Sequence, residues 1–154
     1  MSEVTFDFDK LKEQLIEDEG VIYQIYRDHL GYPTFGIGHL IVKEDPEYGQ
    51  DIGTPVSEER VWEVFERDAK FYRGECMTLY GNKFIFWPQE VQQVLCNMMF
   101  NLGRTRLGQF NKMNQALEEK DWKTAATEGR DSRWYRQVTN RAERLMSRLE
   151  KVGG

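Results

Sequence analysis

The sequence has 154 residues, of which 40% are hydrophobic, 31% are charged and 13% are aromatic. A chain of this length buries about 70% of the surface that its unfolded form exposes, so it can form a core without disulfides or a structural metal. No apolar run approaches the roughly 18 residues of a membrane-spanning helix, and the aromatic content argues against a disordered chain. We therefore expect one soluble globular domain.

The N-terminus and the cysteines suggest a cytoplasmic protein. The stretch from Met1 to Lys12 is acidic where a signal peptide is basic, and no apolar segment follows it. We therefore expect synthesis in the cytoplasm, with no signal peptide and no membrane anchor. Cys76, Cys96 and two histidines are too few soft ligands for a structural zinc site, so we expect no metal and no cofactor. The cysteines are interpreted as reduced thiols, with a single bridge between them as the alternative.

The formal charge of the chain is unevenly distributed. The net charge of −5 argues against a nucleic-acid-binding protein held by phosphate contacts. Residues 1–103 carry 9 basic and 19 acidic side chains, a net of −10, whereas residues 104–154 carry 12 and 7, a net of +5. The basic C-terminal third suits an anionic polymer, and the alternative is a solvated helical surface.

The first half of the chain is predicted to contain a helix, a β-hairpin and a long helix. Apolar residues at helical spacing indicate a helix from Asp9 to Glu19, capped by Gly20. The strands of the hairpin are expected at residues 21–28 and 34–40, because β-branched and aromatic residues flank a turn-like segment. Residues 42–56 are rich in Pro and Gly and indicate a loop, with a short edge strand as the alternative. Ser57 then caps a helix that extends to about Tyr80.

The second half is predicted to be all helical. Pro88 suits the first position of a helix whose apolar residues recur at intervals of three and four until Gly103. Further helices are expected at residues 111–119, 121–127 and 140–152. The pattern predicts a small β-containing front, a connecting helix and a helical back half.

Glu19 is the first candidate for chemistry. It follows Leu15 by four residues and Ile16 by three, so it extends the apolar stripe of the first helix. A carboxyl beside apolar groups and the last carbonyls of a helix favours the protonated form that a general acid requires. The structural alternative is a glutamate that turns into solvent at the helix end.

Asp28 and Thr34 are the second candidate pair. Five residues separate them, so they are expected to face each other across the hairpin and to contact one water molecule. A carboxylate and a hydroxyl together can orient and deprotonate water. The alternative role of Asp28 is to bond the backbone of its own turn. Alternation in the second strand places Gly36 and Gly38 on the face of Thr34, where they would leave room for a flat substrate.

His39 and Asp68 are expected to form a structural ion pair. The same alternation places His39 on the opposite face of the strand, away from the proposed site. Asp68 lies seven residues after Val61 and three after Phe65, on the apolar stripe of the long helix. Because a buried aspartate needs a partner, we predict that His39 and Asp68 join the hairpin to this helix.

Several ordered blocks of the sequence resemble the phage-type lysozymes, glycoside hydrolase family 24. They are Glu17-Asp18-Glu19-Gly20, Ile25-Tyr26-Arg27-Asp28, Gly31-Tyr32-Pro33-Thr34-Phe35-Gly36-Ile37-Gly38-His39-Leu40, Asn97-Met98-Met99-Phe100-Asn101-Leu102-Gly103, Ser132-Arg133-Trp134-Tyr135 and Asn140-Arg141-Ala142. The blocks span about residues 15 to 150, and together they are highly specific.

The resemblance implies an α+β, lysozyme-like fold in a single domain over residues 1–154. A small antiparallel β-sheet lobe at about 15–56 and an all-helical C-terminal lobe at 81–154 would be joined by a connecting helix at about 57–80, with a cleft between the lobes. The implied activity is hydrolysis of the β-1,4 bond between N-acetylmuramic acid and N-acetylglucosamine in peptidoglycan, and we expect inversion at the anomeric carbon.

The resemblance also implies a role for each matching residue. Glu19 would be the general acid, Asp28 would activate water and Thr34 would help to hold that water. The residues implied to support or line the site are Arg141 near Glu19, the salt-bridge pair His39 and Asp68, and the cleft residues Leu40, Phe100, Asn101 and Arg133. The basic C-terminal third would then contact an anionic substrate.

Two other functions are compatible with these residues. A lytic transglycosylase on the same fold uses one acid and leaves a 1,6-anhydro end, whereas a wall-binding or tail structural module would have lost turnover. We expect a monomer that binds peptidoglycan and no nucleic acid. It would act on the cell wall after membrane disruption, in phage-driven lysis or wall penetration.

Overall fold

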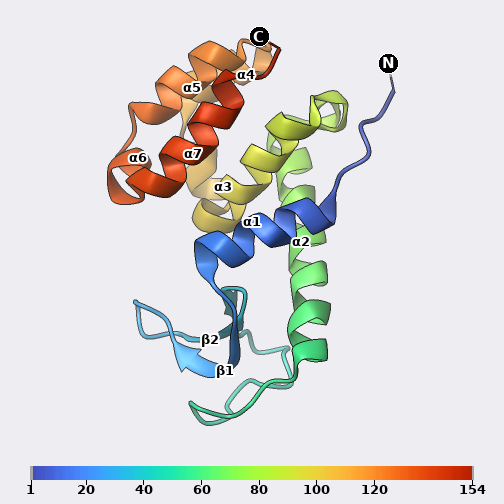
Figure 1. The fold of residues 1–154 in the computed structure, drawn as a ribbon, viewed down its shortest axis with the longest axis vertical. Coiled ribbons are helices and arrows are strands. Elements are labelled where there is room, and N and C mark those ends of the chain that lie inside the picture. Colours follow the sequence, from blue (N-terminus) through green and yellow to red (C-terminus); the bar gives the residue numbers. More distant parts are fainter. Residues whose placement is uncertain (1, 154) are drawn as a thin grey trace. The chain divides into compact units, whose positions relative to one another are not determined.

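The computed structural model describes residues 2–153, and their contacts divide the chain into two compact units. The sheet unit comprises residues 8–71, and the helical unit comprises residues 2–7 together with 72–153. Figure 1 shows the elements of both units in chain order. The mixed fold, with a small antiparallel sheet and many helices, confirms the predicted α+β class. No helix within residues 2–153 is both long enough and apolar enough to cross a bilayer.

The sheet unit begins with α1 (Phe8–Glu19), which leads directly into a three-stranded antiparallel sheet. Its strands are β1 (Ile22–Arg27), β2 (Pro33–Gly36) and β3 (His39–Leu40), in the order β1-β2-β3. The register pairs Tyr26 with Thr34 and then pairs Thr34 with Leu40. These three residues therefore form one row across the sheet.

The single second strand expected at residues 34–40 is wrong, because the chain reverses within it. Gly38 adopts a φ of +60°, which L side chains rarely adopt, and the turn folds β3 back onto β2. The expected open glycine face is also wrong. A Cβ on Gly36 would lie 3.2 Å from a methyl group of Val61, so Gly36 is packed against α2.

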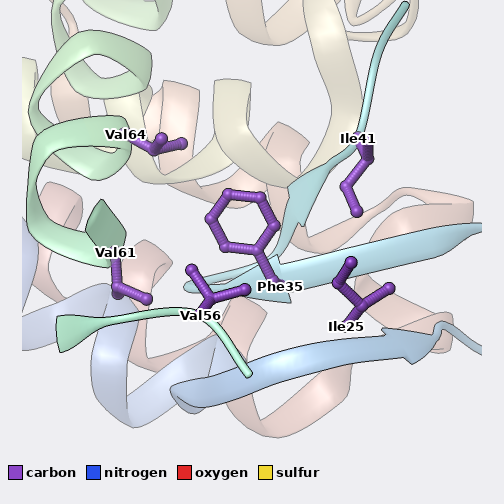
Figure 2. Close-up of a cluster of buried hydrophobic side chains, with 6 residues drawn as sticks. All are labelled: Ile25, Phe35, Ile41, Val56, Val61 and Val64. Carbon is purple, nitrogen blue, oxygen red and sulfur yellow. The ribbon is translucent and has the colours of Figure 1, made fainter. Parts of the chain in front are cut away.

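The core of the sheet unit lies on the face opposite this row. Ile25 of β1 and Phe35 of β2 are fully buried there, among apolar side chains from the following loop and from α2. Figure 2 shows this cluster, which consists of Ile25, Phe35, Ile41, Val56, Val61 and Val64. Helix α2 (Glu58–Tyr80) begins where predicted, because the N–H of Arg60 donates to Oγ of Ser57 at 3.1 Å.

The imidazole of His39 is held between two carboxylates. Its Nδ1 lies 2.6 Å from Oδ2 of Asp68, as the sequence predicts, and its Nε2 lies 2.8 Å from Oδ2 of Asp45, which the sequence analysis did not foresee. Asp45 also accepts the N–H of Val42 at 2.9 Å and a guanidinium N–H of Arg67 at 3.1 Å. His39 therefore connects β3 to α2 through Asp68 and to the loop that follows the sheet through Asp45.

Charges and hydrogen bonds in the cluster of His39, Asp45 and Asp68 favour protonated His39 and ionised Asp45. Burial disfavours the His39 imidazolium, but the hydrogen bonds and charges of Asp68 and Asp45 outweigh it, so the pKa of His39 is raised. Burial acts against ionised Asp45 as well, yet hydrogen bonds from Val42, His39 and Arg67 lower its pKa. Both shifts stabilise the folded state only while His39 is protonated and Asp45 is ionised.

The helical unit contains η1 (Asn82–Phe86) and five α-helices. They are α3 (Gln89–Leu107), α4 (Asn111–Glu118), α5 (Trp122–Arg130), α6 (Arg133–Gln137) and α7 (Thr139–Glu150). The predicted end of α3 at Gly103 is a kink, with non-helical backbone angles at that residue. Helix α5 continues three residues beyond the expected Thr127, because Gly129 is buried beside Met113 and packing carries the helix through it.

Two short elements of the helical unit were not predicted. Both η1 and α6 have five residues, which is too few for helical periodicity to show. Ser132 does cap α6, accepting the N–H of Tyr135 at 3.1 Å. Cys76 and Cys96 are free and buried in this unit, and burial together with the neighbouring Cys96 raises the pKa of the Cys76 thiol.

The His39 cluster predicts a defined pH dependence of stability. His39 has a raised pKa in the folded state, so its contribution is full below about pH 6.5 and is lost as the pH rises through the folded value. Asp45 has a lowered pKa, so its contribution is full above about pH 4 and is lost as the pH falls through its folded value. Asp68→Asn should cost about 3 kcal/mol in the free energy of unfolding near pH 5–6, and less at pH 9, measured by urea unfolding.

The exposed pair of Lys70 and Glu66 provides the control. Their atoms lie 3.1 Å apart, but both side chains are more than 60% exposed, so Glu66→Gln should cost less than about 1 kcal/mol at either pH. An NMR titration of His39 should also show a lower pKa in Asp68→Asn. If the pKa of His39 is the same in both proteins, the ion pair does not hold the sheet to α2.

Candidate active site

Glu19 is the last residue of α1, and its carboxylate lies against the turn between β2 and β3. The helix ends there because the next residue, Gly20, adopts a φ of +74°, after which the chain enters β1. A Cβ on Gly38 would lie 3.2 Å from Oε2 of Glu19. The absence of a side chain on Gly38 thus leaves room for the carboxylate, which is half-buried.

Asp28 is positioned by the hairpin loop that joins β1 to β2. Its Oδ1 accepts the backbone N–H groups of Leu30 and Tyr32, each at 2.9 Å. Its own N–H donates to the carbonyl of Tyr32, also at 2.9 Å. Among residues 2–153, no hydrogen bond engages the second oxygen, Oδ2. Asp28 therefore bonds its own turn, as the structural alternative proposed, and still has one carboxylate oxygen available for chemistry.

Thr34 does not face Asp28 directly, in contrast to the sequence prediction. Its partner across the ladder is Tyr26, whereas Asp28 lies opposite Tyr32. Residues two apart on a strand share a face, so Asp28 and Thr34 are diagonal neighbours on the same side of the hairpin. The Thr34 hydroxyl is buried and donates to the carbonyl of Tyr32 at 2.9 Å.

Tyr26 is a polar residue of this face that the sequence analysis did not single out. Its Cα pairs with that of Thr34, and it lies two residues before Asp28. Burial, together with the negative charges of Glu19 and Asp28, raises the pKa of Tyr26. The charges of both carboxylates therefore act on this phenol. The sequence signal for Tyr26 was its spacing of two residues from Asp28, because residues two apart on a strand share a face.

Leu40 and His39 lie on opposite sides of β3. Leu40 pairs with Thr34 and is 48% exposed, so it borders the face of Tyr26 and Thr34. His39 pairs with Phe35, and their rings lie 5.1 Å apart on the core side. The expectation that His39 points away from the carboxylates agrees with this register.

The four remaining candidates belong to the helical unit. The Phe100 ring packs on Tyr72, with centroids 4.5 Å apart, and Oδ1 of Asn101 accepts the indole N–H of Trp134 at 2.7 Å. Arg133 is exposed and lines a cavity of about 640 Å³ that also includes Arg106, Lys112 and Trp134. These contacts show how the residues are held, and their roles toward a substrate stay predictions.

Arg141 is buried in the helical unit and is held by Asn97. Its Nε and Nη2 donate to Oδ1 of Asn97 at 2.9 and 2.8 Å, and Nη2 also donates to the Asn97 carbonyl at 3.3 Å. The sequence analysis quoted Asn97 within a motif but did not identify it as the anchor of this guanidinium. The approach of Arg141 to Glu19 stays a prediction.

Comparisons with known proteins bear on this arrangement. A family model described as phage lysozyme matches residues 16–151. The chain is 33% identical to the pre-baseplate central spike protein Gp5 of Enterobacteria phage T4, over 93% of this chain but only 29% of that protein. It is 28% identical to probable T4-type lysozyme 2 of Dictyostelium discoideum, over 91% of this chain and 93% of that protein. It is also 25% identical to peptidoglycan hydrolase gp36 of Pseudomonas phage phiKMV, over 90% of this chain and 15% of that protein.

The family match covers all the residues that converge on the sheet face, from Glu19 to Leu40, and continues through the helical unit to residue 151. It thus includes both carboxylates and the elements that position them. The chain belongs to the phage lysozyme family.

Proposed function

We propose that the chain is a muramidase that hydrolyses the β-1,4 bond between N-acetylmuramic acid and N-acetylglucosamine with inversion at the anomeric carbon. The observation that carries this proposal is the position of two carboxylates in the sheet unit. Glu19 lies against the turn between β2 and β3, and Asp28 is fixed by the loop that joins β1 to β2. Two carboxyl groups on one face are the minimum that glycoside hydrolysis requires, one as acid and one as base.

In the proposed reaction, the two carboxyl groups act on opposite sides of the linkage. The protonated Glu19 carboxyl gives its proton to the glycosidic oxygen as the bond from that oxygen to the anomeric carbon breaks. A water molecule held by Asp28 and Thr34 attacks that carbon from the other face, and Asp28 takes a proton from it. Exchange with solvent then returns the proton to Glu19. Inversion requires the two carboxyl groups to be about 6.5–9.5 Å apart, which leaves room for this water.

Two features of the sheet unit support water as the nucleophile. Oδ2 of Asp28 is available, while Oδ1 is fixed by two backbone N–H groups, so the free oxygen has a defined direction. The Thr34 hydroxyl donates its proton to the carbonyl of Tyr32, and its lone pairs can therefore accept a hydrogen bond from water. A lytic transglycosylase needs neither group, because it uses a hydroxyl of the sugar in place of water.

The biological setting is also a proposal. We infer that the partner is bacterial peptidoglycan and that the protein acts on the cell wall after membrane disruption, or during wall penetration. A monomer would suffice for this activity, because Glu19, Asp28 and Thr34 all come from residues 8–71 of one chain. The net charge of +5 in residues 104–154 suits the anionic wall polymer.

Substitution of either carboxylate tests the roles directly. Glu19→Gln should lower turnover on purified peptidoglycan by about 10²–10⁴-fold, because the amide cannot donate the proton. Asp28→Asn should cause a similar loss while it keeps an oxygen for the turn. The measurement is liquid chromatography with mass spectrometry of the released muropeptides. Glu17→Gln, which changes an exposed carboxylate two residues earlier, should leave turnover unchanged. Full activity in Glu19→Gln would overturn the acid assignment.

The products report the bond and the stereochemistry. Digestion in H₂¹⁸O should place ¹⁸O on the reducing end of N-acetylmuramic acid, because water attacks its anomeric carbon. Proton NMR during the first minutes, before mutarotation, should show the α-anomer, the inverted product. A β-anomer would indicate retention, and a 1,6-anhydro product lighter by one water would identify a transglycosylase.

A further inference from the structure

Tyr26 occupies a place on the sheet that the proposed mechanism does not yet use. It is the cross-strand partner of Thr34, and directly opposed residues project from the same face with Cβ atoms about 4.5–5.5 Å apart. Asp28 lies two residues further along, on the same face. Ile25, the residue before Tyr26, is fully buried in the core on the other face. The side chains of Tyr26, Asp28 and Thr34 therefore surround one point above the hairpin.

The hydroxyl of Tyr26 has no hydrogen-bond partner among residues 2–153, although the side chain is half-buried. Two buried or partly buried tyrosines of the helical unit behave differently. The Tyr80 hydroxyl donates to Asn114 at 2.8 Å, and the Tyr135 hydroxyl donates to Glu143 at 2.9 Å. Because a buried phenol hydroxyl usually finds a partner, that of Tyr26 is suited to a molecule that binds on this face.

The donors and acceptors around this point are complementary to water. The Thr34 hydroxyl has its proton on the Tyr32 carbonyl, so it can only accept from a water molecule. An ionised Asp28 Oδ2 can also only accept. The two groups can thus take both protons of one water. The water molecule then lacks only a hydrogen-bond donor. Such a donor would fix one of the two lone pairs of the water oxygen and leave the other directed at the substrate.

We propose that Tyr26 is a fourth catalytic residue, whose hydroxyl donates a hydrogen bond to the attacking water held by Asp28 and Thr34. This inference rests on the hydrolytic function proposed above. As the new bond to the anomeric carbon forms, one water proton passes to Asp28 and Tyr26 keeps its own. Tyr26 acts as a donor throughout the reaction, because burial and the negative charges of Glu19 and Asp28 raise its pKa and disfavour the phenolate.

The test is the variant Tyr26→Phe, which removes the hydroxyl and keeps the ring. We expect kcat to fall by about 10- to 100-fold, because a mispositioned nucleophile reacts slowly, while KM changes by less than about twofold. Tyr23→Phe is the matched control. It makes the same change on the same strand, but Tyr23 is 40% exposed and packs edge-on against Trp62. Its kcat should equal that of the wild type.

A double-variant cycle with Thr34→Val separates catalysis from packing. If Tyr26 and Thr34 act on the same water, the kcat loss in Tyr26→Phe/Thr34→Val should be at least about threefold smaller than the product of the single losses. The effects of the two substitutions on the melting temperature should add. In the control double variant Tyr23→Phe/Thr34→Val, the loss in kcat should equal the product of the two single losses.

Each outcome decides the proposal. A wild-type kcat in Tyr26→Phe, a rise in KM alone, or losses that multiply in the double variant would overturn it. Failure of the hydrolytic function gives a different result, because the wild-type protein would then release a 1,6-anhydro product or no product at all. If those two variants are inactive and Tyr26→Phe is fully active, only the role of Tyr26 is refuted.

Discussion

The reversal of the backbone between β2 and β3 determines where the polar groups of the sheet unit lie. At Gly38 the chain adopts a φ of +60°, and the missing side chain leaves room for the Glu19 carboxylate at the end of α1. The same reversal pairs His39 with Phe35 and brings the imidazole to Asp68 and Asp45. One turn thus serves both faces, because it accommodates the carboxylate on one side and anchors the sheet to α2 on the other.

Asp28 shows how a loop can hold a carboxylate in a fixed direction. Oδ1 is bound by two backbone N–H groups of its own turn, so the carboxylate cannot rotate without breaking them. The second oxygen is thereby oriented before any substrate binds. Such preorganisation lowers the cost of reaching the reactive geometry, which is the main contribution that a protein scaffold makes to a general base. The turn and the proposed chemistry therefore use different oxygens of one side chain.

The two units carry different parts of the candidate machinery. The residues proposed for chemistry come from residues 8–71, whereas the buried Arg141, held by Asn97, and the exposed Arg133 come from the helical unit. The charge follows a similar division, with −10 over residues 1–103 and +5 over residues 104–154. The acidic part carries the carboxyls proposed to react, and we propose that the basic part attracts the anionic wall polymer.

Local pattern in the sequence was sufficient for α1, α2, α4, α7 and the hairpin, because helical periodicity, the Ser57 cap and turn residues act within a few positions. The motif also supplied Glu19, Asp28 and Thr34 as candidates. The apolar stripe of α2 correctly predicted the pair of His39 and Asp68, although Asp68 is only partly buried. Tertiary structure decided the rest. The reversal at Gly38, the second partner Asp45 and the pairing of Tyr26 with Thr34 depend on how the strands and the following loop fold against one another. No local periodicity encodes such contacts, because they arise only when the strands and helices pack.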